Sequence, residues 1–326
     1  MVDIVDEFDF INKIKQNTYH QSGLIKGVGD DAAVFRQTSE DIVTAVDMFV
    51  EGVHFSKKTM DAHHIGYKVL AVNVSDIAAM GATPRYYLVS IACPDSYSHT
   101  YYEQIFRGMR DFASTYKMDL IGGDTVSGKE LAISVTVIGT VHAGKERYRD
   151  QAAPGDIVFV TGTLGDSQAG FYILMNQLDG RDMDYFIKKH QLPEPRVHFV
   201  KSIKNIKRLV LNDISDGLAS ETNEIAESSN VSIKLINAYL PVSQHYNQFP
   251  YHLQRKWMLY GGEDFELVGT VSKDDWEKVK IAGTETNTKV TKIGNVTNQK
   301  VAGGNVVLVE NNKVVPLYKE GYRHLK

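Results

Sequence analysis

The chain has 326 residues, of which 43% are hydrophobic and 23% are charged, and its formal net charge is -4. This length exceeds what one hydrophobic core usually serves, and the composition excludes the disordered and membrane-spanning classes. The small net charge argues against a general nucleic-acid binder, which carries a basic excess on one face. We therefore expect a two-domain globular protein that binds neither nucleic acid nor membrane.

The cellular compartment is indicated by the cysteine content and by the N-terminus. A single cysteine, Cys93, excludes an intrachain disulfide and a zinc cluster built from thiolates. Asp3 and Asp6 stand where a secretory signal needs a positive start and an apolar stretch. No later apolar run is long enough to span a bilayer. The sequence therefore predicts a cytoplasmic protein.

Helices and strands alternate in the pattern of the first 150 residues. An amphipathic helix is expected at 1–16, strands at 33–35 and 42–47, a helix at 61–80, a helix at 101–115, and strands at 118–121 and 131–141. Asp61 is a candidate N-cap of the helix expected at 61–80. The end of that helix is apolar nearly all round, so Asn73 and Asp76 are expected to be buried on one face. The strand at 118–121 is expected to end at Gly122.

A polar segment at 147–156, which ends in Pro154-Gly155, marks the domain boundary, so we expect domains at 1–150 and 151–326. The second domain is predicted to contain a strand at 157–160, a glycine turn, a helix, a strand ending at Asp213, a helix, and strands after Gly262. The fold class is mixed α/β (α+β). The basic run from Lys188 to Arg208 is interpreted as a solvated helix face.

Acidic residues recur beside glycine or small residues at predicted strand ends, and Asp76 lies in an apolar helix. Each Asp-Gly or Gly-Asp pair alone is most simply a turn. Several in one chain indicate a shared cation site, because clustered carboxylates without a cation repel one another. Magnesium takes oxygen ligands and bridges carboxylates to substrate phosphates, so it is the expected ion. The acids are Asp30, Asp31, Asp47, Asp76, Asp124, Asp213 and Asp216.

The segment 123–130 matches the spacing of a phosphate-binding P-loop as far as Lys129. Glu130, however, stands where a serine or threonine should bind magnesium. A P-loop must also open a helix, whereas an alternating strand pattern follows here. The match is therefore interpreted as chance.

The motifs at 27–32, 47–55, 68–82, 121–125, 160–167, 213–218 and 261–267, in this order, resemble the thiamine-monophosphate kinase family. That family lies in an ATP-binding superfamily with aminoimidazole ribonucleotide synthetase and selenophosphate synthetase. The resemblance covers nearly the whole chain. It implies direct in-line transfer of a phosphoryl group from ATP to thiamine monophosphate, the final step of thiamine diphosphate synthesis, in a homodimer that uses several magnesium ions.

The resemblance also implies a role for each matching residue. Domain 1–150 is expected to bind ATP and magnesium and to dimerise, and domain 151–326 to complete the active site. Magnesium is assigned to Asp31, Asp47, Asp76, Asp124, Asp213 and Asp216; ATP to Gly123, Asp124, Arg149 and Ser215; thiamine monophosphate to His54, Glu263 and Tyr322. Asp124 and Arg149 are the expected catalytic residues.

The chain departs from the family at Ala45 and Val46, where hydroxyl residues often precede the Asp47 position, so a side-chain metal ligand is missing. Taken singly, His54 is more simply a structural histidine, Arg149 an exposed linker residue, and Glu263 part of a tight turn.

Three other functions stay open. One is another ATP-dependent enzyme of the superfamily, although a selenophosphate synthetase would carry a reactive cysteine near the N-terminus. The second is a magnesium-dependent phosphohydrolase, in which the acids activate water. The third is a noncatalytic nucleotide-binding protein.

Overall fold

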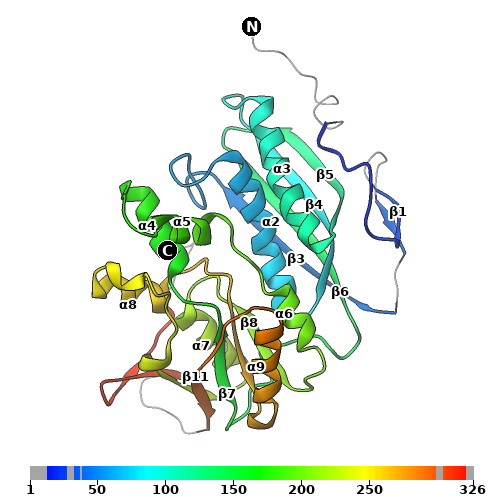
Figure 1. The fold of residues 1–326 in the computed structure, drawn as a ribbon. Coiled ribbons are helices and arrows are strands. Elements are labelled where there is room, and N and C mark those ends of the chain that lie inside the picture. The colour runs from blue at the N-terminus through cyan, green and yellow to red at the C-terminus, as the bar shows by residue number, and fades with distance from the viewer. Residues whose placement is uncertain (1–12, 28–32, 37–38, 299–303, 321–326) are drawn as a thin grey trace. The chain divides into compact units, whose positions relative to one another are not determined.

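The computed structural model describes residues 13–27, 33–36, 39–298 and 304–320 (Figure 1). It has the mixed α/β class and the two-part organisation that the sequence predicts. One compact unit comprises residues 1–77 and 83–143, and the other comprises residues 78–82 and 144–326. The helix expected at 1–16 falls mostly outside the described residues. Among the helices that are described, none combines the length and the apolar character needed to cross a bilayer.

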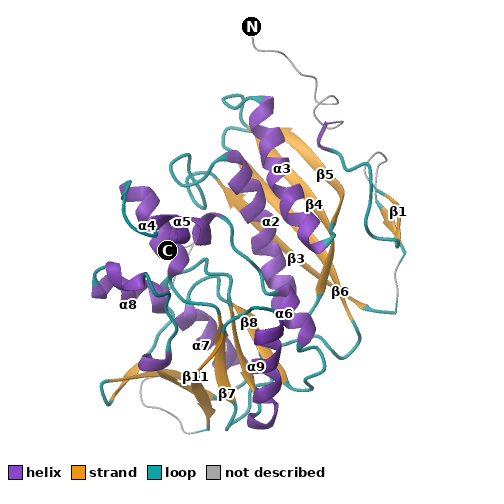
Figure 2. Ribbon diagram, viewed as in Figure 1, coloured by secondary structure: helices purple, strands orange, loops and turns teal. Residues whose placement is uncertain are grey.

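The first unit contains a four-stranded sheet with the strand order β3-β6-β4-β5. Its strands are β3 (Asp41–Val50), β4 (Thr83–Cys93), β5 (Asp119–Ser127) and β6 (Ala132–Val141), and β1 (Leu24–Lys26) pairs separately with β2 (Val34–Phe35). Helices α2 (Ala62–Ala79) and α3 (His99–Tyr116) lie along one face of the sheet (Figure 2). Burial alternates along β6, because successive strand residues point to opposite faces.

Helix α2 begins at the predicted N-cap. The Asp61 carboxylate accepts a hydrogen bond from the His64 N–H at 2.9 Å, which satisfies one of the unpaired donors of the first turn. Further along the helix, Asn73 is fully buried and donates to the Val69 carbonyl at 2.9 Å, whereas Asp76 is only partly buried. The expected burial of both side chains therefore holds fully for Asn73 alone.

Strand β5 does not end at Gly122, and that prediction is wrong. The strand continues to Ser127 and pairs in parallel with β4, with one register shift between Tyr87 and Leu88 and with Ser127 opposite Cys93. At Gly123 a Cβ atom would overlap the Val89 carbonyl oxygen of the neighbouring strand. Glycine is needed here for a close approach between two strands, so the same residue that signals a turn in sequence serves a strand.

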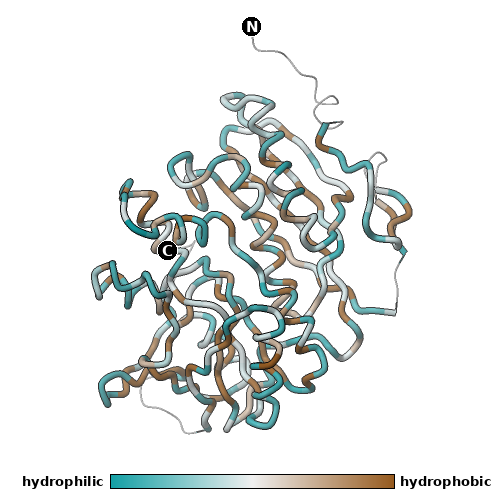
Figure 3. Tube along the Cα trace, viewed as in Figure 1, coloured by the Kyte–Doolittle hydropathy of each residue, from teal (hydrophilic) through white to brown (hydrophobic). Residues whose placement is uncertain are grey.

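The second unit contains a seven-stranded sheet with the order β13-β12-β9-β11-β7-β10-β8. The strands are β7 (Ile157–Thr161), β8 (Leu209–Asp213), β9 (Ser232–Ile236), β10 (Leu267–Val271), β11 (Val290–Thr297), β12 (Val306–Glu310) and β13 (Lys313–Pro316). Their pairings are antiparallel except that of β9 with β12. Strands β7, β8 and β10 are buried along their whole length and run through the hydrophobic core (Figure 3).

Helices flank this sheet and supply the rest of the core. They are α4 (Asp166–Asn176), α5 (Met183–Gln191), α6 (Val197–Ser202), α7 (Leu218–Ser228), α8 (Tyr251–Tyr260) and α9 (Trp276–Glu285), with short 3-10 turns at Asn237–Tyr239, Tyr246–Gln248 and Lys273–Asp275. The predicted strand ending at Asp213 and the helix after it correspond to β8 and α7. Helices α8 and α9 were not predicted, and neither were strands β4 and β9.

The basic run between residues 188 and 208 is not a uniformly solvated face. Lys201 and Lys204 are exposed as expected. Arg196, in contrast, binds the buried Glu266 carboxylate, and Arg208 donates to Asp156 at 2.7 Å. The solvated interpretation is therefore wrong for Arg196 and for His190, whose side chains are 10% and 1% exposed. Arg208 is half-exposed, although it also neutralises a carboxylate that the fold has removed from water.

Two glycines set the distance between α2 and α3. A Cβ atom at Gly66 would overlap the Ile105 carbonyl oxygen, and one at Gly108 would overlap the His63 carbonyl oxygen. We expect Gly108→Ala to lower the free energy of unfolding by about 1–3 kcal/mol, because the helices must separate to admit the methyl group. Urea denaturation would measure the change. Thr115→Ala, at an exposed position of the same helix, is the control and should change stability little; equal stability of both variants would contradict the prediction.

Candidate functional site

Two of the motif segments, 213–217 and 261–266, lie side by side in the second unit. The backbone N–H groups of Glu263 and Phe265 donate to the carbonyls of Ser215 and Ile214 at 2.7 and 3.0 Å. The Ile214 N–H in turn donates to the Glu266 carbonyl at 2.7 Å. The residues expected to contact metal and ATP are thereby joined through the main chain to one expected to contact the acceptor.

The turn that carries Glu263 has an unusual backbone. Glu263 has φ +67° and Phe265 has φ +48°, both in the left-handed region that L-residues seldom adopt. At the preceding Gly262, a Cβ atom would overlap the Ser215 carbonyl oxygen. The glycine is therefore required for the contact between the two segments, and the strained conformation of Glu263 is held by its hydrogen bond to Ser215.

The segment 213–217 is fixed by hydrogen bonds to Glu221, a residue that the sequence did not indicate. Its carboxylate accepts from the Asn212 amide at 2.5 Å, from the Asp216 N–H at 3.2 Å and from the Ser215 hydroxyl at 3.4 Å. Burial, together with the nearby charge of Asp213, raises the pKa of Glu221 to about 8. In the sequence this acid is indistinguishable from any acid in the first turn of a helix.

Arg149 belongs to the same cluster of charges. Its guanidinium Nη1 lies 3.8 Å from Glu224 Oε2, and its charge acts to lower the pKa of Glu221. The Arg149 carbonyl accepts from the Ser229 hydroxyl at 2.6 Å, which attaches this segment to the end of α7. The side chain is 49% exposed, so the guanidinium remains accessible to a ligand.

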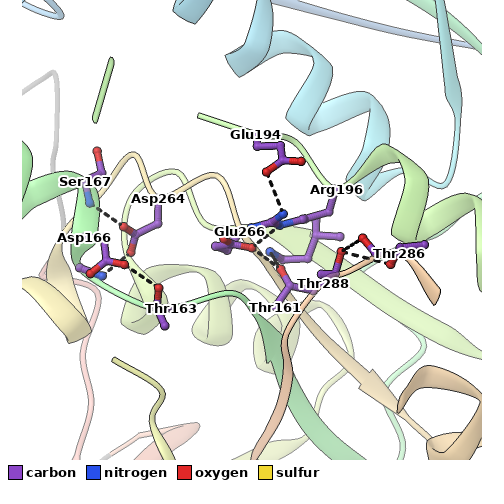
Figure 4. Close-up of polar contacts among 12 residues, drawn as sticks. Thr161, Thr163, Asp166, Ser167, Glu194, Arg196, Asp264, Glu266, Thr286 and Thr288 are labelled. Carbon is purple, nitrogen blue, oxygen red and sulfur yellow. Dashed lines mark hydrogen bonds and ion pairs between the residues drawn. The ribbon is translucent and has the colours of Figure 1, made fainter. Parts of the chain in front are cut away.

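The acids that follow Glu263 are structural. Glu266 is buried and receives a bidentate pair of hydrogen bonds from Arg196, one of them at 2.6 Å, and a third from the Thr161 hydroxyl at 2.7 Å (Figure 4). Burial acts to raise the pKa of Glu266, but the Arg196 charge and hydrogen bonds outweigh it and hold the pKa below its usual range. The Leu267 N–H donates to the Thr161 hydroxyl at 2.8 Å, and this hydrogen bond connects β7 to β10.

Asp264 caps helix α4. Its carboxylate accepts from the Gly165 N–H at 2.6 Å and from the Ser167 N–H at 3.2 Å (Figure 4). These amides belong to the unpaired donors at a helix N-terminus, where a negative charge is favourable. Burial nevertheless raises the pKa of Asp264 well above its usual value.

Asp166, at the start of α4, also lacks a basic partner among the hydrogen bonds it makes. It accepts three hydroxyl hydrogen bonds, from Thr163 at 2.5 Å, Tyr185 at 2.8 Å and Ser243 at 2.9 Å. Burial raises its pKa. Together Asp166, Asp264 and Glu266 hold the glycine turn at 162–165 against the segment that presents Glu263.

In the first unit, the structure brings Asp47 and Asp76 together. The two carboxylates are within hydrogen-bonding contact, and burial raises the pKa of Asp47 although the Asp76 bond and the charge of His54 act to lower it. Nδ1 of His54 accepts the Val50 N–H at 3.1 Å, and the ring stacks on Phe49 at 5.3 Å. His54 thus has the structural partners expected of an ordinary histidine, in addition to its place beside the acids.

Asp124 points away from this pair. The register places Met48, Ser134, Ser90 and Asp124 in one row across the sheet, whereas Asp47 lies in the next row with the buried Val89 and Val135. Because adjacent rows face opposite sides of a sheet, Asp124 and its neighbours lie on the face that α2 and α3 do not cover. Gly123 precedes it in β5, and Asp124 is exposed.

Asp31 and Tyr322, two further predicted site residues, lie outside the described residues. Over the described ranges, no three His, Cys, Asp or Glu side chains gather closely enough to hold a metal. The oxygen donors nonetheless suit magnesium in kind, since two touching carboxylates require a proton or a cation between them.

Comparisons with known proteins match both parts of the chain. Residues 29–141 match the family "AIR synthase related protein, N-terminal domain", and residues 153–306 match "AIR synthase related protein, C-terminal domain". The thiamine-monophosphate kinase of Bacillus subtilis (strain 168) is 44% identical over 99% of this chain and 100% of that protein.

Solved structures agree with this match. The thiamine-monophosphate kinase of Stenotrophomonas maltophilia K279a has a TM-score of 0.84 and 31% identity, covering 93% of this chain and 96% of that one. "AaThiL complexed with AMPPCP and TMP" has a TM-score of 0.77 and 30% identity, covering 98% and 97%.

The buried pair of Arg196 and Glu266 generates a stability prediction with a defined pH dependence. Arg196→Met should cost about 3–5 kcal/mol at pH 7.5, because the Glu266 carboxylate is left buried without its cation. In that variant the folded-state pKa of Glu266 rises above its unfolded value, so stability is regained as the pH falls through the raised pKa. Denaturation at pH 7.5 and pH 5 measures this. The double variant Arg196→Met/Glu266→Gln is the control and should lose the pH dependence; an unchanged pH dependence would contradict the assignment.

Proposed function

The chain belongs to the thiamine-monophosphate kinase family, and from this membership we infer that it uses ATP to phosphorylate thiamine monophosphate, yielding thiamine diphosphate and ADP. The observation that carries the inference is the full-length match to kinases named for this reaction, one of which was solved with AMPPCP and TMP. The arrangement of segments 213–217 and 261–266 supports it, since it joins the proposed nucleotide and acceptor residues.

The transfer is direct and in line. An oxygen of the acceptor phosphate attacks the γ-phosphorus of ATP, and the bond between that phosphorus and the β,γ-bridging oxygen breaks, so ADP leaves with the electron pair. The acceptor phosphate is already anionic at neutral pH and needs no strong general base. The main obstacle is the repulsion between two polyanions, which catalysis must offset by positioning and by positive charge.

The chain's own residues divide this work. Arg149 pairs with the ATP phosphates, because its exposed guanidinium offers planar bidentate hydrogen bonding. Gly123 and Ser215 contact the nucleotide, and His54, Glu263 and Tyr322 contact thiamine monophosphate. We also propose, as the family resemblance implies, that domain 1–150 binds ATP and magnesium and that domain 151–326 completes the active site.

Magnesium is the proposed cofactor. Asp47 and Asp76 would hold one ion in the first unit, and Asp213 and Asp216 would hold one in the second, with Asp31 as a further ligand. Asp124 lies on the opposite face of the sheet from Asp47, so it would bind a separate ion. The ion supplies neutralisation of the phosphate charges when it is bound. Val46 offers no side-chain donor beside Asp47.

We also propose a cytoplasmic location. The only cysteine is Cys93, and burial raises the pKa of its thiol to about 11, so it is a poor thiolate nucleophile. Such cysteine usage suits a reducing compartment.

The activity is tested by mass spectrometry of the products formed from ATP, magnesium and thiamine monophosphate. We expect thiamine diphosphate and ADP in equal amounts, and Asp76→Asn and Asp124→Asn should each reduce kcat by about 100-fold or more without loss of folding, by analogy with the removal of charge-stabilising groups. Asp95→Asn, an exposed acid of the same unit, is the matched control and should keep full activity.

The same assay separates the rival functions. Release of phosphate from ATP without an acceptor would favour a phosphohydrolase, and binding of ATP with no product under any acceptor would favour a nucleotide-binding protein. Product formation with aminoimidazole precursors in place of thiamine monophosphate would favour another enzyme of the superfamily.

We propose that two copies of the chain associate through the sheet face that α2 and α3 leave uncovered. This face carries large hydrophobic side chains that are about half exposed or more: Ile42, Val46 and Met48 of β3, and Val126 of β5. These side chains lie on the two edge strands of the sheet, and exposed apolar side chains gathered on one face of a protein mark an interaction surface. A second copy suits the surface, because an isologous contact buries the same residues on both chains.

Met48→Lys should therefore abolish the dimer, because it would place two uncompensated charges in the apolar contact. Light scattering coupled to size exclusion should give the wild type twice the chain mass of 36.5 kDa and the variant one chain mass. Ile281→Lys, at an exposed apolar residue of α9, is the control and should stay dimeric. A wild type with the mass of one chain would refute the proposal.

A further inference from the structure

A buried histidine that is not among the proposed ligand-contacting residues lies next to Glu263, the proposed acceptor-binding carboxylate. His190, near the end of α5, is 1% exposed, and its Nδ1 lies 3.5 Å from Glu263 Oε2. The same Nδ1 lies 3.2 Å from the Ser167 hydroxyl. Nothing in the reaction itself requires this histidine, so its burial against Glu263 calls for a separate explanation.

The position of the imidazole is set by the packing of α4 against α5. A Cβ atom at Gly170 of α4 would overlap the Phe186 carbonyl of α5 and would lie 2.9 Å from the His190 Cβ. The Phe171 ring lies 5.6 Å from the imidazole, at an angle of 52°. The ring is therefore enclosed by two helices in close contact and has little freedom to move.

Ser167 is itself fixed in place. Its N–H donates to Asp264 at 3.2 Å in the first turn of α4. Asp264, Ser167, His190 and Glu263 thus form a continuous polar chain, which begins at the helix N-terminus and ends at a side chain that is 26% exposed. An ionised carboxylate only accepts hydrogen bonds, so the contact with Glu263 requires the tautomer that carries its proton on Nδ1, and the Ser167 hydroxyl is then a second acceptor of that proton.

We propose that His190 is a positioning residue that orients Glu263 toward the positively charged, amine-bearing part of thiamine. A carboxylate repels the acceptor's phosphate and attracts a cationic ring and N–H donors, so Glu263 recognises the thiamine part. The backbone of Glu263 is held by Ser215, but this bond leaves the side-chain torsions unrestrained. His190 supplies that restraint, which reduces the entropy lost on binding. The inference rests on the proposed function.

The test uses two substitutions of the histidine that differ in where they place an amide. His190→Asn puts its NH₂ group near the position of Nδ1, whereas His190→Gln places it near that of Nε2, although glutamine is closer to histidine in volume. We expect His190→Gln to raise KM for thiamine monophosphate about tenfold, because the polar contact with the Glu263 carboxylate is lost, with kcat and KM for ATP nearly unchanged. His190→Asn should remain within about threefold of the wild type.

Controls separate positioning from folding. His252→Gln, at an exposed histidine of α8, should match the wild type. In a Glu263→Gln background, His190→Gln should cause no further rise in KM, because residues that act through one another are not additive. If asparagine and glutamine behave alike, if KM for ATP rises in parallel, or if the effects of the two positions add, the inference is wrong.

A measurement on the unsubstituted protein avoids any loss of folding. The ¹⁵N resonances of the His190 imidazole should shift when thiamine monophosphate is added and should not shift with inorganic phosphate. An unmoved imidazole would overturn the inference. A wild type that forms no thiamine diphosphate would overturn the proposed function itself, whereas an active wild type with unaltered His190 variants would overturn the positioning role only.

Discussion

Three backbone hydrogen bonds between residues 214–215 and 263–266 are the constraint on which the site in the second unit depends. They continue the pairing of β8 with β10 beyond the ends of both strands. The loops at 214–215 and 263–266 are therefore aligned in the same register as the buried strands that they follow and precede. Loops positioned in this way can carry functional residues on a rigid support. This arrangement requires the energetically unfavourable left-handed conformation of Glu263. The adjacent Gly262 makes the contact with Ser215 sterically possible.

Three buried carboxylates lie near these backbone hydrogen bonds, and each is stabilised by different partners. Glu266 has a guanidinium, Asp264 has the amides of a helix N-terminus, and Asp166 has three hydroxyl groups. Only the carboxylate with the guanidinium has a lowered pKa, because neutral donors do not outweigh burial in the other two. The glycine-rich turn at 162–165 is thereby fixed without itself supplying charged groups.

The first unit uses its sheet in a different way. The face under α2 and α3 buries an apolar core and holds Asp47 beside Asp76, whereas the other face exposes Asp124 together with large apolar side chains. A strand alternates between faces with a period of two, so adjacent positions of β3 can serve a polar site and a contact surface. This alternation explains how one ten-residue strand contributes to both proposals.

Much of this protein was determined by its sequence alone. Periodicity and caps located α2, α3, α4, α7 and several strands, because those signals are local, and the order of the motifs identified the family. Strands β4 and β9 and helices α8 and α9 were not predicted. The tertiary structure decided which acids meet. Asp47 and Asp76 are in contact, and Asp124 faces the other side of the sheet. Glu221, Asp264 and Glu266 fix the segments of the second unit's site through buried hydrogen bonds. Sequence spacing cannot reveal these differences, because the environment of a carboxylate is set by residues distant in the chain, such as Arg196, about seventy positions before Glu266. Gly123 shows the same limit: a turn signal in sequence became a close contact between strands once β4 lay beside it.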